Sequence, residues 1–163
     1  MRRLLLTLLL AAGSAQAAID ITDDTGQALH LTQPAKRIVS LAPHITEMLF
    51  AAGAGNQVVG AVQYSDYPEA AKKIARVGGY TSVDMEKVAA LKPDLVVAWK
   101  SGNRGAHLDK LRALGIPVFI NEPRRIDDVA RSIAQLGKLA GTDSAGEAAA
   151  QAFRKRHAAL AAK

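Results

Sequence analysis

Apolar residues in this chain fall into short runs that are separated by longer segments of mixed character. The clearest run covers residues 95–98, which include two valines, and it lies between Lys-Pro-Asp at 92–94 and the polar stretch that begins after Trp99. Proline cannot continue a helix and disfavours helical geometry in the residue before it, so a preceding helix ends there. A short apolar run with turn residues on both sides is typical of a buried strand. We therefore predict a central strand that delivers Trp99 to an edge of a sheet.

Four other apolar runs have similar lengths and similar boundaries. Amphipathic or alanine-rich segments separate them and are predicted to be helices, several of which end at a glycine. Ahead of this pattern, residues 18–31 alternate loosely around a glycine-containing turn, which predicts a hairpin of two short strands. The other strands are predicted over 37–41, 58–62, 75–77 and 117–121, and the helices over 43–52, 69–74, 85–91, 104–114, 126–140 and from 143 or 144 to 163.

Strands and helices alternate throughout the chain after the hairpin. This alternation is typical of βαβ units, in which a parallel sheet is covered by helices on both faces and the crossovers are right-handed. We therefore predict an α/β fold, in which a parallel-sheet, Rossmann-like lobe carries an amino-terminal hairpin.

Aromatic and polar residues follow the predicted strands. In an open parallel sheet, ligands bind outside the carboxyl ends of the strands. All three tyrosines and the single tryptophan fall at these ends, and side chains with an apolar face and a polar tip suit a binding cleft. Packing on the rim of the sheet is the alternative, but the grouping of all four favours a cleft. The residues at the strand ends are Pro43, His44, Gln63, Tyr64, Asp66, Tyr67, Tyr80, Trp99, Lys100, Asn103, Asn121 and Glu122.

Composition narrows the possible classes of protein. A chain of 163 residues is long enough for one domain with a substantial core. It has no cysteine, which excludes a disulfide framework, a thiolate metal site and a lipid-anchored amino-terminal cysteine. The formal net charge is +6, but the basic residues are scattered through the predicted helices, so we expect no nucleic-acid partner.

The amino terminus has the pattern of a secretory signal peptide. Two arginines precede the apolar run 4–12, and the small-residue sequence Ala-Gln-Ala ends at Ala17. The apolar run is too short to span a bilayer, which needs about 20 residues. We predict that residues 1–17 are a signal peptide cleaved after Ala17, and that the mature chain is periplasmic and not lipid-anchored.

No arrangement of residues in the sequence indicates catalysis. The Gly-Ala-Gly sequence at 53–55 lies between a helix and a strand, whereas a dinucleotide fingerprint needs the reverse order. His44 is the one histidine at the predicted edge, and as a metal ligand it would need two or three partners. Nothing marks Asp66 and Glu122 as an acid and base pair. We predict that the protein is not an enzyme and that it holds no metal or cofactor.

Three stretches of the sequence resemble a known family. RIVSLAPHITE at 37–47, VVGAVQYSDYP at 58–68 and VGGYTSVDMEKVAALKPDLVVAW at 77–99 are similar, in this order, to the periplasmic binding proteins that feed ABC importers of cobalamin and iron-siderophores. The resemblance extends from about Ala18 to the end of the chain. The runs YSDYP and LKPDLVVAWKSGN are most similar to the cobalamin-binding members, whereas siderophore, haem and metal binders share the KPDLV core.

The resemblance implies a protein of two α/β lobes that are joined by one long helix. Residues 18–141 would form the first lobe, residues 142–163 would begin the joining helix, and the second lobe would be absent from this chain. The ligand would lie between the lobes, so this chain would supply half of the cleft. Full-length members are expected to be monomers that pass cobalamin, as a transported ligand, to the permease of an ABC importer in the inner membrane.

The resemblance also assigns roles to individual residues. Tyr64 would contact the ligand, and Trp99 would lie at the end of the corresponding strand. Tyr80 takes the place of a tryptophan that lines the cleft. Glu86 would dock onto arginines of the permease, although on its own it is a first-turn carboxylate favoured by the helix dipole. Tyrosine and tryptophan rings can cover a corrin ring, while tyrosine hydroxyls and asparagine side chains can meet its amide arms.

Two alternatives remain open at this stage. The ligand could be a ferric siderophore or haem instead of cobalamin. The chain could also be a half-lobe that binds a partner and no ligand, in which case Glu86 would matter and Tyr64 would not.

Overall fold

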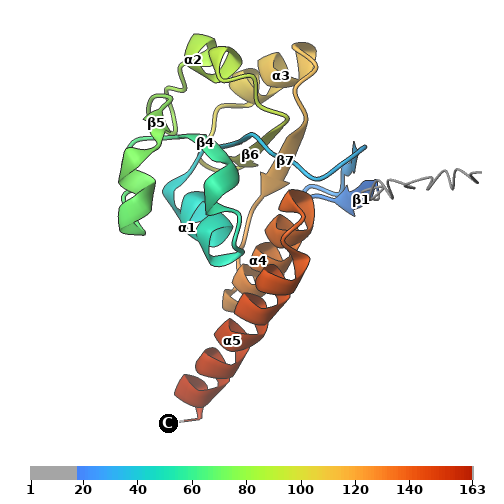
Figure 1. The fold of residues 1–163 in the computed structure, drawn as a ribbon, viewed down its shortest axis with the longest axis vertical. Coiled ribbons are helices and arrows are strands. Elements are labelled where there is room, and N and C mark those ends of the chain that lie inside the picture. Colours follow the sequence, from blue (N-terminus) through green and yellow to red (C-terminus); the bar gives the residue numbers. More distant parts are fainter. Residues whose placement is uncertain (1–17, 163) are drawn as a thin grey trace, which may run out of the picture.

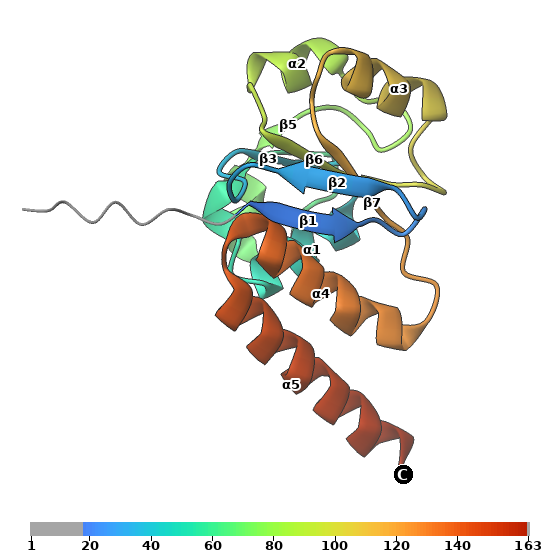
Figure 2. The ribbon, with the colours of Figure 1, turned by 90° about the vertical axis from the view of Figure 1, so that its right-hand side faces the viewer.

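Five parallel strands form the central sheet of the molecule in a computed structural model that describes residues 18–162. The predicted signal peptide, residues 1–17, lies outside the described residues. Helices cover both faces of the sheet, which gives three layers (Figures 1 and 2). The predicted α/β fold is therefore confirmed. The strands are β3 (Ile38–Ser40), β4 (Val58–Ala61), β5 (Ala75–Arg76), β6 (Leu95–Trp99) and β7 (Val118–Asn121).

The strand order is β5-β4-β3-β6-β7, so the chain builds the sheet outward from β3 in both directions. It first moves through β4 to the β5 edge, and then returns to pair β6 with β3 and ends at the β7 edge. The order therefore reverses between β3 and β6, whose carboxyl ends lie side by side. In doubly wound sheets, ligands bind in the crevice at this reversal point.

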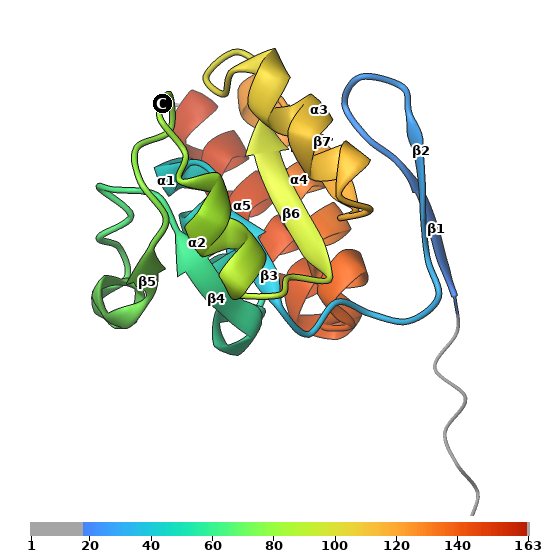
Figure 3. The same ribbon diagram turned by 90° about the horizontal axis from the view of Figure 1, so that it is seen from above.

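The helices divide between the two faces of the sheet. One face carries α2 and α3, which lie in front of the sheet in Figure 3. The other face carries α1, α4 and α5 (Figures 2 and 3). Each face buries its own apolar core. The short helix predicted over 69–74 is a 3₁₀ helix that covers residues 69–73. The helices are α1 (Pro43–Ala51), α2 (Met85–Ala90), α3 (Gly105–Ala113), α4 (Ile126–Ala140) and α5 (Asp143–Ala161), with 3₁₀ turns η1 (Gly55–Gln57) and η2 (Glu69–Lys73).

Asp94 fixes the start of β6 beside β3. Its carboxylate accepts hydrogen bonds from the backbone N–H groups of Lys36 and Arg37, each at 2.8 Å. The Arg37 side chain in turn donates to the carbonyl of Leu91, at the end of α2. These bonds hold the two strands in the register that pairs Ile38 with Leu95. The Lys-Pro-Asp sequence is therefore a structural anchor at the edge opposite the expected cleft.

Helices α4 and α5 approach each other unusually closely. A Cβ atom on Gly137 would lie 2.9 Å from the Cα of Gly146, so only glycines allow this contact. Gly141 ends α4 in the left-handed conformation, with φ of 69°. Gly146 and Ala150 are the buried residues of α5, and most of its second half is exposed.

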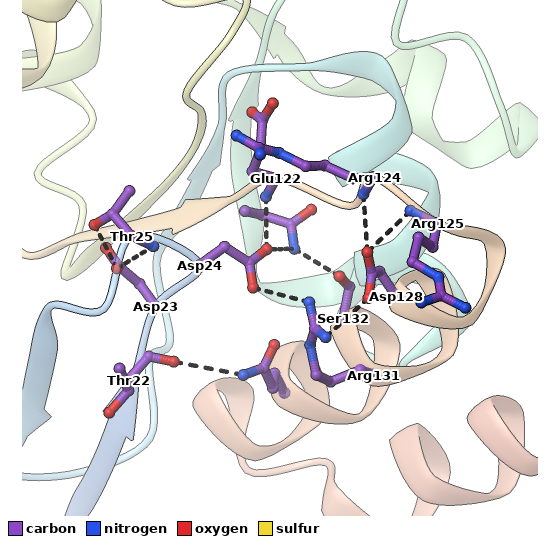
Figure 4. A network of polar contacts seen from close by, with 12 residues as sticks. Thr22, Asp23, Asp24, Thr25, Glu122, Arg124, Arg125, Asp128, Arg131 and Ser132 are labelled. Atoms are coloured by element: carbon purple, nitrogen blue, oxygen red, sulfur yellow. Dashed lines mark hydrogen bonds and ion pairs between the residues drawn. The ribbon is translucent and has the colours of Figure 1, made fainter.

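A polar network ties the amino-terminal hairpin of β1 (Ile19–Thr22) and β2 (Ala28–Leu31) to the β7 edge (Figure 4). The Asp24 carboxylate accepts hydrogen bonds from the Glu122 N–H at 2.6 Å and the Arg131 guanidinium at 3.2 Å. The Asp24 N–H donates to the carbonyl of Ile120. An edge strand leaves backbone groups unpaired, and Asp24 pairs the Ile120 carbonyl on β7 and the Glu122 N–H directly after the strand.

Within residues 18–162, no helix is both long and apolar enough to cross a membrane.

Replacement of Asp24 by alanine tests how much this network contributes to the stability of the fold. The variant leaves the Glu122 N–H without its partner and removes one of the two carboxylates that pair with Arg131, which keeps its ion pair with Asp128. The Asp24 side chain is only 9% exposed, so water cannot readily replace it. We expect the free energy of unfolding to fall by about 2 kcal/mol. Urea denaturation followed by circular dichroism measures it.

Asp20→Ala is the matched control, because it removes a carboxylate from the same hairpin. Asp20 pairs with His30 on an exposed surface, so its loss should cost no more than about 0.5 kcal/mol. Equal losses in the two variants would contradict a structural role for the Asp24 network.

Candidate ligand-binding site

The carboxyl ends of β3 and β6 place His44 beside Trp99. Pro43 is the first residue of α1, where its fixed φ suits a helix and its missing N–H costs nothing. His44 therefore lies in the first turn, directly over the reversal point. The imidazole and indole rings meet edge to face, with centroids 5.2 Å apart and planes at 87°, a favourable geometry for aromatic pairs.

Tyr80 completes a group of three rings. It comes from the loop between β5 and α2, and its ring centroid lies 6.0 Å from that of Trp99, with the planes at 47°. Tyr80 is 41% exposed and Trp99 is partly buried. We call His44, Tyr80 and Trp99 the aromatic cluster. Three residues that are far apart in the sequence thus form one surface at the expected edge.

Tyr64 and Tyr67 lie on the loop that follows β4 and are 76% and 70% exposed. In the described part of the chain, neither ring stacks on the aromatic cluster. Tyr64 has φ of 66°, in the left-handed region that side chains rarely adopt. Such conformations persist where the surrounding structure imposes them, often at functional sites. The two rings are therefore displayed to solvent and available to a ligand.

Glu122 and Ser101 form the polar rim next to the cluster. The Glu122 carboxylate accepts hydrogen bonds from the backbone N–H of Ser101, at 3.0 Å, and from its hydroxyl. Burial by itself would raise the pKa of Glu122. The two bonds from Ser101, with the charges of Arg124 and Lys100, outweigh burial and lower that pKa. Glu122 is therefore a carboxylate at neutral pH and holds the turn after β6 against the end of β7.

Burial lowers the pKa of His44 below 6.5, and the negative charge of Glu122 only partly opposes this effect. His44 is therefore a neutral imidazole at neutral pH. Its Nε2 atom is buried and has no hydrogen-bond partner among the described residues. Within residues 18–162, no three or more His, Cys, Asp or Glu side chains gather in a way that could hold a metal ion.

The expectation that asparagine side chains at the strand ends are free to meet a ligand is wrong for both candidates. Asn103 is 5% exposed and Asn121 is fully buried. Asn121 donates from Nδ2 to the hydroxyl of Ser132 at 2.7 Å, and both polar atoms of the Asn103 amide are bonded to backbone groups of the protein. A sequence pattern places these residues at the edge but does not reveal which way their amides point.

An apolar groove beside the cluster was not predicted. It lies between α1, α4 and α5, has a volume of about 520 Å³, and shares His44 and Tyr67 with the edge. Met48, Ile133 and Phe153 supply much of its apolar lining. The one feature of the sequence that could have indicated the groove is the apolar side of the last helix. The groove itself could not be predicted, because its walls come from helices that are distant in the chain.

Glu86 is exposed in the first turn of α2. Asp84 caps this helix by accepting a hydrogen bond from the Lys87 N–H at 3.0 Å. This bond lowers the pKa of Asp84 despite the opposing effect of desolvation. The carboxylate of Glu86 therefore stands on a firmly capped helix end and is accessible to a partner.

Comparisons with known proteins agree on one family. Residues 38–163 match the family described as periplasmic binding protein. The vitamin B12-binding protein of Vibrio parahaemolyticus serotype O3:K6 is 39% identical over 131 residues, which are 80% of this chain and 48% of that protein.

Solved structures show the same relation. The periplasmic vitamin B12 binding protein BtuF of Vibrio cholerae superposes with a TM-score of 0.75 at 41% identity, over 78% of this chain and 50% of that one. A periplasmic heme binding protein from Pseudomonas aeruginosa superposes with a TM-score of 0.70 at 26% identity, over 75% of this chain and 44% of that one. The chain thus spans about half the length of the relatives that it matches.

The left-handed conformation of Tyr64 leads to a stability prediction. Glycine adopts this region without the steric cost of about 1 kcal/mol or more that a side chain meets, and its greater freedom in the unfolded chain offsets part of the gain. Tyr64→Gly should therefore leave the free energy of unfolding unchanged or raise it by up to about 1 kcal/mol.

Gln63→Gly is the control, since Gln63 is an exposed neighbour without positive φ. It should lose about 0.5–1 kcal/mol. Urea denaturation of both variants measures these free energies of unfolding. A larger loss of stability in Tyr64→Gly than in Gln63→Gly would show that the conformation of Tyr64 is not strained.

His44 predicts a dependence of stability on pH. The folded chain binds a proton at His44 less readily than the unfolded chain does, because the folded pKa lies below 6.5. The contribution of His44 to stability is therefore full above pH 6.5 and falls as the pH drops from there to the folded pKa.

Unfolding free energies of the wild type and of His44→Gln, measured from pH 8 to pH 5, should show this difference. The wild type should lose stability relative to the variant as the pH falls below 6.5. Parallel curves for the two proteins would mean that burial does not perturb His44.

Proposed function

This chain belongs to the periplasmic binding protein family, and we propose that it is the amino-terminal lobe of a component that captures cobalamin for an ABC importer. The observation that carries the proposal is the aromatic cluster at the reversal point of the sheet, where Trp99, Tyr80 and His44 form one surface. The identity to vitamin B12-binding relatives over this same lobe supports it. In this proposal, residues 18–141 are the lobe and residues 142–163 begin the helix that joins it to a second one.

The chemistry of the edge suits a corrin. Such a ring is large and partly apolar, and the indole of Trp99 with the phenol of Tyr80 offers it a matching apolar face. The exposed hydroxyls of Tyr64 and Tyr67 can reach amide arms at its periphery. Capture and release break no covalent bond, so the proposed role is binding without catalysis, with cobalamin as cargo and not as cofactor.

The same proposal places the protein in the periplasm, with residues 1–17 as its signal peptide. Glu86 is proposed to dock onto the permease in the inner membrane, which its exposure on the capped end of α2 permits. In this proposal the described residues supply one wall of a cleft and a second lobe supplies the wall opposite. The length of the relatives, about twice that of this chain, supports it.

Haem is the second candidate, because a heme binding protein shares the fold. The position of His44 argues against axial ligation of a haem iron from this lobe. Its Nε2 is buried and its ring meets the Trp99 indole edge to face, so this nitrogen is not offered to a ligand above the cluster. This geometry favours a ligand that is held by ring faces and hydroxyls.

Equilibrium dialysis of the chain against cyanocobalamin tests the proposal. We expect saturable but weak binding, with Kd above about 1 μM, because one wall buries only part of the ligand. An excess of haem or of a ferric siderophore should not displace the bound cyanocobalamin. Trp99→Ala should weaken binding at least about tenfold, as the loss of a central aromatic anchor does.

Leu114→Ala is the control for loss of an exposed apolar side chain, since Leu114 follows α3 at the opposite edge of the sheet. Its Kd should match that of the wild type. Tighter binding of haem than of cyanocobalamin, or binding that is insensitive to Trp99→Ala, would overturn the proposed ligand or site.

A further inference from the structure

The turn that follows β6 folds back beneath the Trp99 ring. The N–H groups of Gly102 and Asn103 both donate to the Trp99 carbonyl, at 3.3 and 2.9 Å. A Cβ atom on Gly102 would overlap the indole, so the ring rests directly on the backbone at this glycine. The turn therefore supports the indole from below and also connects β6 to α3.

The Asn103 side chain lies within this turn, and both polar atoms of its amide form hydrogen bonds. Its Oδ1 accepts a hydrogen bond from the Trp99 N–H at 2.7 Å. Its Nδ2 donates to the carbonyls of Leu41 at 3.0 Å and Tyr80 at 2.8 Å. A buried amide costs free energy unless it is bonded, and here both of its polar atoms are.

These three bonds reach the three segments that carry the aromatic cluster. Leu41 directly follows β3 and lies two residues before α1, whose first turn carries His44. Tyr80 belongs to the loop between β5 and α2, and Trp99 ends β6. These segments are separated by tens of residues in the chain, yet one side chain bonds to the backbone of each.

We propose that Asn103 is a positioning residue that preassembles the ligand-facing surface by holding the Tyr80 loop at a fixed distance from Trp99. The inference about affinity rests on the proposed function, whereas the inference about the positions of the rings does not. An asparagine suits the position because it combines one acceptor with two donors on a short side chain. A surface ordered before the ligand arrives avoids the entropic cost of ordering it during binding.

Asn103→Asp is the variant that separates the three bonds at nearly constant volume. It keeps an acceptor for the Trp99 N–H but replaces the two donors with an oxygen that faces the carbonyls of Leu41 and Tyr80. We expect the Tyr80 loop to move away from the indole. Thr142→Val is the matched control, because it removes a 2.7 Å hydrogen bond from a side chain to the Ala52 carbonyl at the opposite edge of the sheet.

Fluorescence of the chain without ligand gives the first measurement. Trp99 is the single tryptophan, so the whole indole signal comes from the site. Asn103→Asp should shift the emission maximum to the red and increase quenching by acrylamide, while Thr142→Val should leave both unchanged at a similar loss of thermal stability. An unchanged spectrum in folded Asn103→Asp would overturn the proposal.

Equilibrium dialysis against cyanocobalamin gives the second measurement. Asn103→Asp should raise Kd by about tenfold relative to the wild type, as expected when buried groups lose their partners, and Thr142→Val by less than about twofold. If the wild type binds no cyanocobalamin, the proposed function fails while the fluorescence result still decides the positioning role. A fluorescence shift without a change in Kd would overturn the link to affinity.

If Asn103→Asp does not fold, hydrogen exchange of the wild type replaces it. The Trp99 N–H should then exchange as slowly as the amides in the middle of β6, because Asn103 holds it. Fast exchange at Trp99 would overturn the proposal without any variant.

Discussion

The strand order of the sheet reverses between β3 and β6, and most features of the molecule depend on this reversal. The chain leaves the carboxyl ends of these two neighbours in opposite directions, into α1 on one face and toward α3 on the other. A gap opens where the two connections diverge, and only side chains at the strand ends can line it. His44 and Trp99 occupy this gap, and the loop that carries Tyr80 closes it from the third side.

Two groups of polar contacts keep this arrangement in place, and they act at different points. The network around Asp24 closes the β7 edge with the hairpin and joins it to α4. Asn103 acts at the centre of the sheet, where it joins three connections to one another. The first group protects an edge that could otherwise pair with another chain, and the second orders a surface that is meant to meet a ligand. At the centre of each group is one short side chain, Asp24 or Asn103, whose polar atoms all have partners.

Much of this structure could be predicted from the sequence, for reasons that particular residues make clear. The apolar run 95–98 and its Lys-Pro-Asp boundary identified β6, and the position of Trp99 after it identified the edge. The burial of Asn103 could not be foreseen, because an asparagine after a strand has the same pattern whether it faces solvent or bonds to distant carbonyls. The left-handed φ of Tyr64 and the groove between α1, α4 and α5 were also hidden, since both depend on contacts that arise only in the folded chain. Residues 69–73 satisfied a helical pattern but are too few, beside Pro68, to extend beyond a 3₁₀ turn.

Because the glycine contact between α4 and α5 lies near the beginning of α5, a small change of angle there causes a large displacement at the end of the helix. Gly146 touches Gly137 near the beginning of α5, and roughly 15 further residues, about 22 Å at 1.5 Å each, extend from that point to Ala161. A tilt of about 5° at this pivot would carry the far end through about 2 Å of arc over that length. A larger residue at either glycine would push the two helices apart and change the direction of α5. Two glycines thus fix the direction of the longest helix within residues 18–162.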